Sequence, residues 1–287
     1  MSQKKIRILG EAPIDWGARN GPAIGECNDL YFLKDEPWLE FRRSTLKECK
    51  QDGVIPWIRS GCRGALLEAE TLGLQILIGP NCVFADSNQP LKNDVELRSP
   101  SVYKLLMSDE VNADLARSLC KYDKSKIQQV PYFMRPELYD RPFRYKKIWD
   151  CYYHVKTSIN RFSIEHFKKI TATHHGWYNY FELQFKAEHS EICIHGCDYD
   201  NYGLAIHEIS MLGCPIVYDN RGFKRGSIGE GMGIEVSNIG SNTPEDSKEI
   251  IRAAEEAKAM DRRKVWEASR IYQSVDNLLK RYRKAIF

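Results

Sequence analysis

The chain has 287 residues, of which 43% are hydrophobic and 28% charged, and its formal net charge is +3. These are ordinary values for a globular protein, and they exclude both a largely disordered chain and a strongly basic nucleic-acid-binding protein. Nine cysteines are scattered along the sequence without a Cys-x-x-Cys pair, which argues against a zinc ribbon and favours free thiols in a reducing compartment.

The first half of the chain alternates predicted strands and helices. The apolar run Ile6–Leu9 predicts a strand that ends at Gly10 and leads into a turn-rich loop. The further elements predicted here are a helix over 37–50, a strand over 53–58, a helix over 63–72, a strand over 74–78 stopped by Gly79-Pro80, a strand over 102–107, a helix over 108–122 with Ser108 as its N-cap, and a strand over 127–130.

A proline-rich segment over 131–147 predicts an interdomain linker, and the alternation then resumes. Strands are predicted over 149–155, 170–173, 191–195 and from 216, and helices over 163–169, 180–188, 203–211, 244–258 with Thr243 as N-cap, and 262–285 as one long helix. Alternating strands and helices predict an α/β protein with mostly parallel sheets, divided into domains 1–135 and 145–287.

The most informative segment is Asp200–Val217. It contains an acid, an aromatic-glycine turn and a short apolar helix that carries Glu208 and is closed by Gly213 and Pro215. The turn leaves backbone N–H groups at a helix N-terminus, where a diphosphate binds well. Carboxylates accept paired hydrogen bonds, so the two acids suit the hydroxyl groups of a sugar and a ribose. The segment therefore predicts a nucleotide-sugar site.

This segment resembles the C-terminal-domain signature of GT-B glycosyltransferases of the glycogen-synthase-like, retaining type ("glycosyl transferases group 1"). The residues in register with that signature are Asp200, Asn201, Tyr202, Gly203, Glu208, Gly213 and Pro215. The rest of the chain agrees with the family in layout, with a proline-rich linker and a final helix of the kind that crosses back to the first domain. The resemblance implies two Rossmann-like domains with a cleft between them and a long C-terminal helix.

The resemblance also implies roles for single residues. Glu208 would bind the ribose hydroxyls, Asp200 would contact the transferred sugar, and the backbone N–H groups of Tyr202, Gly203 and Leu204 would bind the diphosphate. The family has a glutamate where this chain has Asp200, which leaves the sugar open. From the residues alone, Asp200 could instead be a helix N-cap and Glu208 a solvated helix residue.

Two further positions are candidates on the donor side. Lys156 and Arg161 follow the strand over 149–155, where the family places cationic diphosphate ligands, although both could be surface charges. Tyr178 lies in the run His174–Tyr178, where the resemblance places the nucleotide base, and an aromatic ring can stack on a base. Adjacent histidines chelate a metal poorly, so this run does not favour a metal site.

Acidic and glycine residues also lie beyond the first predicted strand, at the edge of the sheet where open α/β proteins bind ligands. Gly21 would belong to the loop that covers the diphosphate in the family. Asp15 or Glu11 would be a general base if the enzyme inverts the sugar, and each could be an ordinary turn residue. Asn81 and Asp86 follow another strand at this edge and could line the acceptor side.

The sequence predicts a cytoplasmic, metal-independent glycosyltransferase that needs no cofactor. It would move a hexosyl or pentosyl group from a nucleotide-diphosphate sugar to a hydroxyl acceptor such as a glycan, a small molecule or a modified DNA base. Asp200, Lys156 and Asp15 are the catalytic candidates. The alternatives are a nucleotide-sugar epimerase, a DNA-base glucosyltransferase-like enzyme, and a non-catalytic nucleotide-sugar-binding module. The basic amphipathic tail over 278–284 fits a membrane surface or polyanion, or a packed terminal helix.

Overall fold

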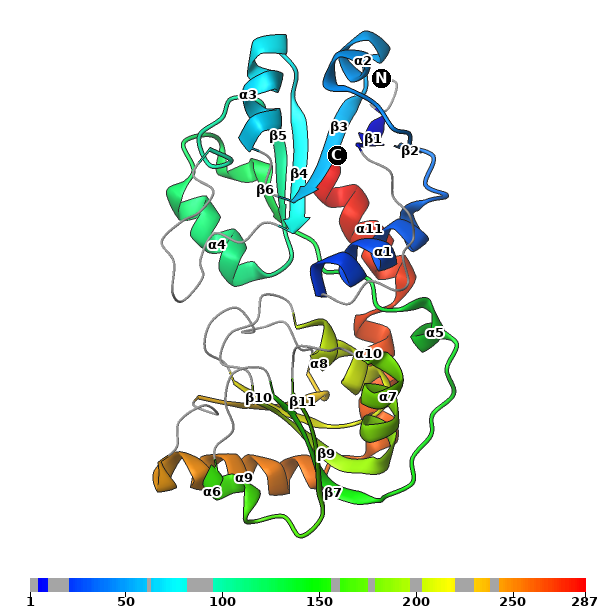
Figure 1. Cartoon of the computed structure of the whole chain (residues 1–287), viewed down its shortest axis with the longest axis vertical. Helices are drawn as coiled ribbons and strands as arrows, with labels where there is room; N and C mark the ends of the chain where they lie inside the picture. The colour runs from blue at the N-terminus through cyan, green and yellow to red at the C-terminus, as the bar shows by residue number, and fades with distance from the viewer. Residues whose placement is uncertain are drawn as a thin grey trace. The chain divides into compact units, whose positions relative to one another are not determined.

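The computed structural model describes residues 5–9, 21–60, 63–81, 95–155, 161–174, 179–196, 203–219, 230–237 and 243–287. These residues form two compact units (Figure 1). Unit 1 holds the described residues 5–9 and 22–133 together with Val275–Phe287, and unit 2 holds Gly21 and the described residues of Met134–Ser274. The second domain of the sequence analysis extended to residue 287, whereas unit 2 ends at Ser274.

Unit 1 contains a six-stranded parallel sheet in the order β2-β1-β3-β4-β5-β6. Its strands are β1 (Ile6–Ile8), β2 (Leu39–Phe41), β3 (Ile55–Ser60), β4 (Ile76–Asn81), β5 (Val102–Met107) and β6 (Ile127–Gln129). Its helices are α1 (Gly21–Leu33), α2 (Leu46–Asp52), α3 (Arg63–Leu72), α4 (Glu110–Leu119), the 3-10 turn η1 (Lys124–Lys126) and α11 (Val275–Ile286). Every strand but the edge strands is paired on both sides, which is typical of a buried parallel sheet.

A buried carboxylate joins three distant segments of unit 1. Asp29 on α1 accepts hydrogen bonds from the Tyr282 hydroxyl at 2.8 Å and from the Phe133 backbone N–H at 2.9 Å, and it pairs with the Arg59 guanidinium. The rings of Phe133 and Tyr282 stack with their centroids 5.7 Å apart. The final helix is therefore fixed in unit 1 by both polar and apolar contacts.

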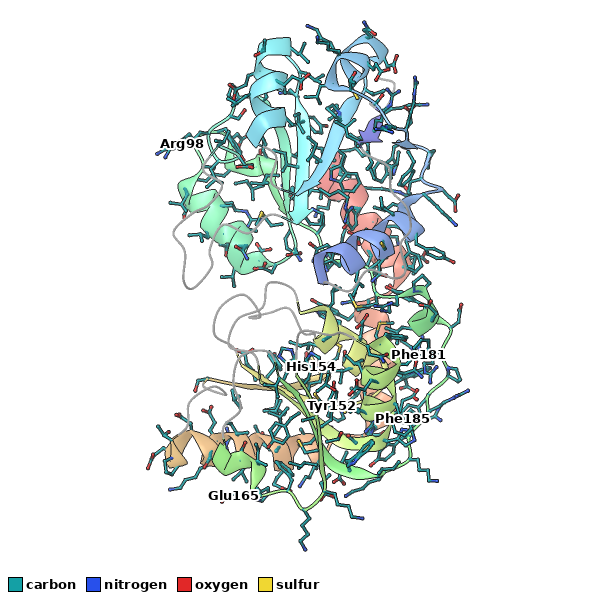
Figure 2. The ribbon with its side chains drawn as sticks, viewed as in Figure 1. Arg98, Tyr152, His154, Glu165, Phe181 and Phe185 are labelled. Atoms are coloured by element: carbon teal, nitrogen blue, oxygen red, sulfur yellow. The ribbon has the colours of Figure 1, made fainter. Side chains whose placement is uncertain are left out.

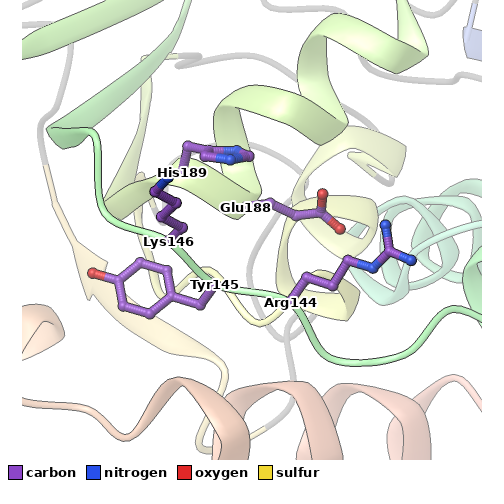
Figure 3. A pocket seen from close by; sticks show the side chains of 5 residues that line it. All are labelled: Arg144, Tyr145, Lys146, Glu188 and His189. Atoms are coloured by element: carbon purple, nitrogen blue, oxygen red, sulfur yellow. The ribbon is translucent and has the colours of Figure 1, made fainter.

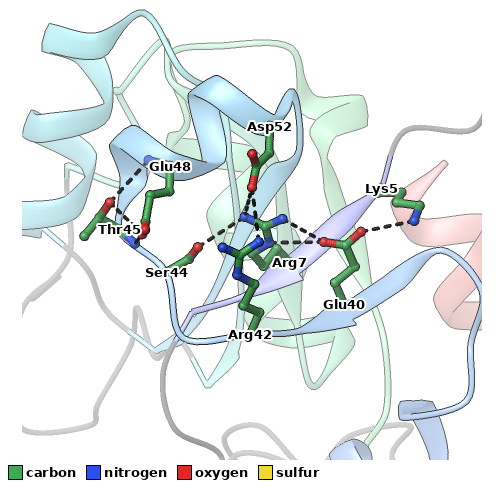
Figure 4. A network of polar contacts seen from close by, with 8 residues as sticks. All are labelled: Lys5, Arg7, Glu40, Arg42, Ser44, Thr45, Glu48 and Asp52. Carbon is green, nitrogen blue, oxygen red and sulfur yellow. Dashed lines mark hydrogen bonds and ion pairs between the residues drawn. The ribbon is translucent and has the colours of Figure 1, made fainter.

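A second ionic network holds the edge of the same sheet (Figure 4). Arg7 on β1 is buried and donates hydrogen bonds to Glu40 at 2.9 and 3.1 Å, to Asp52 at 2.7 Å and to Ser44 at 3.1 Å. These partners come from β2, from α2 and from the loop between them. A single guanidinium thus joins β1, β2 and α2, because it offers five donors in a fixed plane.

Unit 2 contains a five-stranded parallel sheet in the order β11-β10-β9-β7-β8. Its strands are β7 (Trp149–Val155), β8 (Ile170–His174), β9 (Ser190–Gly196), β10 (Ile216–Asp219) and β11 (Gly233–Val236). Its helices are α5 (Pro136–Tyr139), α6 (Arg161–Ile164), α7 (Tyr180–His189), α8 (Leu204–Met211), α9 (Pro244–Lys258) and α10 (Arg262–Tyr272). One face of the sheet packs against α9 through an apolar cluster that includes Tyr153, Ile194 and Ala254, and α7 and α8 lie over the other face (Figure 1).

Several predicted elements differ from the structure. The predicted helix over 37–50 is wrong, because Leu39–Phe41 pairs with β1 and the helix begins only at Leu46. A capping box sets that start: the Thr45 side chain accepts from the Glu48 N–H, and Glu48 accepts from the Thr45 N–H. The helix α1 begins at Gly21, where the sequence predicted a loop.

Other differences concern where elements end. β4 continues through Gly79-Pro80 to Asn81, and Asp109 rather than Ser108 caps α4. The predicted helix over 163–169 is reduced to α6, Arg161–Ile164. The C-terminal helical stretch is present and is divided at Gln273 and Ser274 into α10 and α11. The N-cap at Thr243 is confirmed.

Candidate functional site

The topology of unit 2 defines where a ligand of this sheet binds. From β7 the chain passes to β8 on one side of the sheet, and then to β9 on the other side of β7. Ligands of open parallel sheets bind at the carboxyl ends of the strands where the connections diverge in this way. The candidate site therefore lies beyond Val155 and Gly196, the last residues of β7 and β9.

The helix that follows β9 begins with a glycine. Gly203 occupies the N-cap position of α8 with φ +71°, in the left-handed region that a residue with a Cβ rarely adopts. It offers no side chain to cap the helix. The first N–H groups of a helix have no partner within it, so this end of α8 has backbone donors for an anionic group. Gly203 and Leu204 are the described members of the predicted diphosphate site.

Glu208 lies five residues along the same helix and is wholly buried. Its Oε1 accepts a hydrogen bond from Arg135 Nε at 3.2 Å, and its Oε2 accepts none from the described residues. The alternative of a solvated helix residue is therefore wrong. Leaving one carboxylate oxygen buried without a donor costs about 1–3 kcal/mol, so the arrangement calls for a reason other than stability.

The surroundings of Glu208 change its proton affinity. Burial raises the pKa of Glu208 to about 7, because a charged carboxylate loses its hydration inside the protein. The Arg135 charge and its hydrogen bond oppose that rise, and the nearby Glu137 adds to it. The adjacent His207 is also wholly buried, and burial lowers the pKa of His207 to about 3, so this imidazole is neutral at physiological pH.

A row of polar side chains lies on the α7–α8 face of the sheet. Successive registers place these residues side by side: Thr173, His154, His195, Tyr218 and Glu235. Each is the next-to-last residue of its strand. The imidazoles of His154 and His195 stack with centroids 5.3 Å apart, and the Tyr218 hydroxyl donates to Glu235 at 3.2 Å. His154 Nδ1 is 2.9 Å from the Tyr152 hydroxyl, and both residues are labelled in Figure 2.

We call these five residues the polar row. They were not predicted from the sequence. The signal for the row was a polar residue one position before the end of five strands, but the pairing order of the strands was needed to align them. The polar row crosses the sheet one residue before the carboxyl ends of its strands, which include β7 and β9, where the site is expected. It provides hydrogen-bonding groups beneath that edge, in place of the apolar side chains on the α9 face.

Many predicted site residues lie outside the described residues. These are Asp15, Lys156, Tyr178, Asp200 and Tyr202, together with Glu11 and Asp86. Arg161, Gly21 and Asn81 are described in their backbone only, as the first residues of α6 and α1 and the last of β4. The structure thus brings together Gly203, Leu204 and Glu208, and it adds Arg135, which the sequence analysis did not single out.

A surface pocket of about 430 Å³ lies elsewhere on unit 2 (Figure 3). Arg144, Tyr145 and Lys146 line it from the extended linker, and Glu188 and His189 line it from the end of α7. Glu188 is paired with Arg141 at 2.6 Å. The pocket has no residue in common with the candidate site.

Among the described residues, no three metal-ligating side chains come together as a metal site would require. None of the helices in the described part of the chain is long and apolar enough to cross a membrane.

No model of a known protein family and no curated protein sequence matches the chain. Solved structures match over nearly its whole length. HepE from Anabaena, in complex with UDP-glucose, has a TM-score of 0.65 with 10% identity, and the match covers 98% of this chain and 99% of that one. The lipopolysaccharide outer core galactosyltransferase WaaB has a TM-score of 0.60 with 12% identity, and the match covers 99% of both chains.

A protein of Listeria monocytogenes assigned as a UDP-N-acetylglucosamine 2-epimerase also matches, with a TM-score of 0.52 and 11% identity over 100% of this chain and 98% of that one. At such identities the likeness concerns the fold and carries no residue-by-residue correspondence. The chemistry of the site must therefore be argued from the residues of this chain.

Proposed function

We propose that this chain, which has the GT-B fold that HepE and WaaB share, is a glycosyltransferase that moves a sugar from a nucleotide-diphosphate donor to a hydroxyl acceptor. HepE binds UDP-glucose, which makes a uridine nucleotide the first donor to test. Because the fold is also used by other enzymes, the proposal depends on the site itself.

The observation that carries the proposal is the Glu208 Oε2 atom, which is buried and accepts no hydrogen bond from any described residue, on the helix α8 that begins after Gly203. A ribose has vicinal hydroxyls that donate to a carboxylate, and a diphosphate is matched by helix N–H groups. Both groups occur here on one short helix, beside the strand ends where the topology predicts a ligand. A nucleotide diphosphate satisfies the two requirements at once.

Glu208 is inaccessible to solvent in the structure, so the proposal requires the side chains around it to move when the ribose enters. Rearrangement of this kind accompanies binding in a substantial minority of complexes. The ribose hydroxyls then donate to a carboxylate that is already desolvated. Such hydrogen bonds are strong because the acceptor is charged.

The remaining roles follow the family resemblance. Lys156 and Arg161 neutralise the diphosphate, Asp200 contacts the transferred sugar, and Tyr178 stacks on the base. Gly21 belongs to the loop over the diphosphate. In this proposal the reaction retains the configuration of the sugar and needs no metal, and Asp15 serves as a base only if the reaction inverts.

Catalysis in this scheme is electrostatic. The bond between the sugar and the diphosphate breaks as negative charge collects on the leaving nucleoside diphosphate. Fixed cations and the N-terminus of α8 stabilise that charge more strongly in the transition state than in the ground state, which lowers the barrier. The acceptor oxygen forms the new bond to the sugar carbon as the bond to the diphosphate breaks, and its proton passes to the departing diphosphate oxygen.

A melting-temperature screen with UDP-, GDP-, ADP- and dTDP-sugars tests the donor site, because a ligand that binds only the folded state raises the melting temperature. The proposal expects a selective rise that Glu208→Ala abolishes and that the exposed control Glu267→Ala keeps. Release of nucleoside diphosphate in the presence of candidate acceptors then tests transfer. A flat response to all four donors contradicts the proposal.

The likeness to the Listeria protein supports a second candidate, a nucleotide-sugar epimerase. An epimerase converts its nucleotide sugar without any acceptor, whereas a transferase leaves the donor sugar unchanged or hydrolyses it slowly. Product analysis by chromatography without acceptor therefore separates the two.

A further inference from the structure

The linker between the units contributes one side chain to the candidate donor site. Arg135 is the N-cap residue of α5, directly before Pro136, and it is largely buried. Its Nε donates to Glu208 Oε1 at 3.2 Å, across a sequence separation of 73 residues. Its guanidinium carbon also lies 4.7 Å from the centre of the Tyr180 ring, at the start of α7. The contact is therefore one of tertiary structure, between α5, α7 and α8 of unit 2.

We propose that Arg135 is the positioning residue of the donor site: its guanidinium orients the Glu208 carboxylate through Oε1 and leaves Oε2 to accept from a ribose hydroxyl. This inference rests on the proposed function. A carboxylate has two oxygens with separate lone pairs, so it can accept from an arginine and from a ligand at the same time. Fixing it on one side reduces the entropy lost when the ligand binds on the other.

The segment that carries Arg135 is held independently of Glu208. The Arg270 guanidinium on α10 donates to the backbone carbonyls of Leu138, Tyr139 and Arg141. The Tyr139 hydroxyl in turn accepts from the Met134 N–H at 3.2 Å. Because these bonds fix the backbone on both sides of α5, Arg135 is in place before a ligand arrives. Preorganisation of this kind is what a positioning residue requires.

The charges around Glu208 make Arg135 the group that favours its ionised form. Among the described residues, α5 contributes Arg135 and Glu137, α7 contributes Tyr180 and the Arg141-paired Glu188, and α8 itself contributes neutral His207. The elements α10 and β10 also pack against α8. The helix α10 carries Arg270 and Tyr272, whose ring stacks on that of His207 with centroids 6.0 Å apart, and β10 carries Tyr218, whose hydroxyl donates to Glu235. Arg135 is the cation among these that contacts the carboxylate.

This placement links donor binding to pH. The pKa of Glu208 is raised to about 7 by burial even with Arg135 in place. A protonated carboxyl group offers fewer acceptor sites to a ribose and has no charge, so the donor prefers the ionised form. Affinity should therefore be constant above the pKa and fall by up to about tenfold per pH unit below it. Loss of Arg135 should move that fall to higher pH, because the opposing cation is gone.

The test is a calorimetric titration with UDP-glucose, or with the sugar nucleotide of the panel that stabilises the wild type most, between pH 5.5 and 8.5. A sugar nucleotide suits this range because its diphosphate is a diester without the titrating proton of a terminal phosphate. The proteins compared are the wild type, Arg135→Met, Arg135→Lys and Arg144→Met. Arg144 lies on the same linker and lines the pocket of Figure 3, which shares no residue with the candidate site. The control variant Arg144→Met therefore removes the same charge outside that site.

The expected result is a binding midpoint near pH 7 for the wild type and for Arg144→Met. Arg135→Met should move the midpoint up by at least one pH unit and weaken binding at pH 7 by ten- to a hundredfold. Arg135→Lys should keep the midpoint near that of the wild type but bind more weakly at every pH, because an ammonium group supplies the charge without the planar geometry. If Arg135 has only a structural role, Arg135→Met and Arg135→Lys both keep the wild-type binding midpoint.

Two outcomes overturn the inference while the proposed function stands: a wild-type affinity that does not change with pH, or an Arg135→Met curve that keeps the wild-type midpoint. If Arg135→Met does not fold, Arg135→Lys and Glu208→Gln decide the matter, since the latter should abolish the pH step. Failure of the wild type to bind any sugar nucleotide of the panel at any pH overturns the proposed function, and the inference with it.

Discussion

At the scale of single residues, two buried carboxylates differ in how many of their oxygens are paired. Asp29 and Glu208 are both wholly buried. Asp29 is satisfied by Arg59, by the Tyr282 hydroxyl and by a backbone N–H, as expected of an acid that joins segments of a core. Among the described residues, Glu208 has a donor on Oε1 and none on Oε2. A buried carboxylate oxygen without a donor lowers the stability of the folded protein, and a ligand that donates to it restores that stability. Such an oxygen therefore favours a binding role.

Replacing Glu208 by glutamine tests this cost in the absence of ligand. The pKa of Glu208 is raised to about 7 in the folded protein from 4.5, so between these values the folded state holds a proton that the unfolded state has lost. Stability of the wild type should therefore fall, relative to Glu208→Gln, by up to about 1.4 kcal/mol per pH unit as pH rises from 5 to 7, and the difference should level off above pH 8. Urea unfolding at several pH values measures this, and a constant difference across the range contradicts it.

Replacing Tyr282 by phenylalanine tests the buried cluster of unit 1. The change removes the hydrogen bond from the Tyr282 hydroxyl to Asp29 and leaves the ring in place. The expected loss is about 1–3 kcal/mol of unfolding free energy, because a buried charged acceptor loses one donor. The exposed control Tyr145→Phe should change stability by less than about 0.5 kcal/mol. Equal effects of the two variants in denaturant unfolding count against the assignment.

At the scale of elements, a local capping signal sets the start of α2, where hydrophobic spacing alone predicted a longer helix. The residues over 37–50 show helical spacing, yet Leu39–Phe41 is recruited as a strand by β1. The capping box of Thr45 and Glu48 then sets the start of α2 (Figure 4), and Gly53 ends the helix with a φ of +68°. Tertiary pairing of β2 overrode the spacing, whereas the cap was encoded in four neighbouring residues.

Replacing Thr45 by alanine tests this cap. The variant loses the side-chain acceptor for the Glu48 N–H and should unfold with about 1 kcal/mol less free energy. Thr71→Ala is a suitable control, because Thr71 lies inside α3 and bonds only back to the Leu67 carbonyl, where alanine is the better helix former. Thermal unfolding of both variants checks the difference. A neutral Thr45→Ala is the result that would contradict it.

At the scale of the whole chain, the last helix returns to the first unit. The chain leaves unit 1 after Phe133 and re-enters it at Val275. In α11 the residues Leu278, Tyr282 and Ile286 are buried in the same core as Trp57 and Phe133. The apolar face of the basic amphipathic tail is therefore packed in unit 1, as predicted for a terminal helix, with Lys280, Arg283 and Lys284 exposed.

Removing residues 275–287 tests this return. The truncated chain exposes the side chains that α11 covers and leaves Asp29 without the Tyr282 donor. We expect loss of the cooperative unfolding transition of unit 1 and binding of a dye that reports exposed apolar surface. Changing the exposed Lys280 and Lys284 to glutamine should leave both properties unchanged. A truncated protein that unfolds like the full chain rejects the prediction.

The sequence by itself determined the class of fold and the helix on which the candidate site lies. Strands alternating with helices predicted two parallel α/β sheets, and the spacing from Gly203 through Glu208 to Gly213 put a carboxylate on a glycine-started helix, because periodicity and turns are encoded by neighbouring residues. Only the tertiary structure decided that Glu208 is buried, that Arg135 binds it from 73 residues away, and that His154 and His195 lie side by side. Burial, partners and strand register depend on long-range packing, for which no short stretch of sequence holds the information.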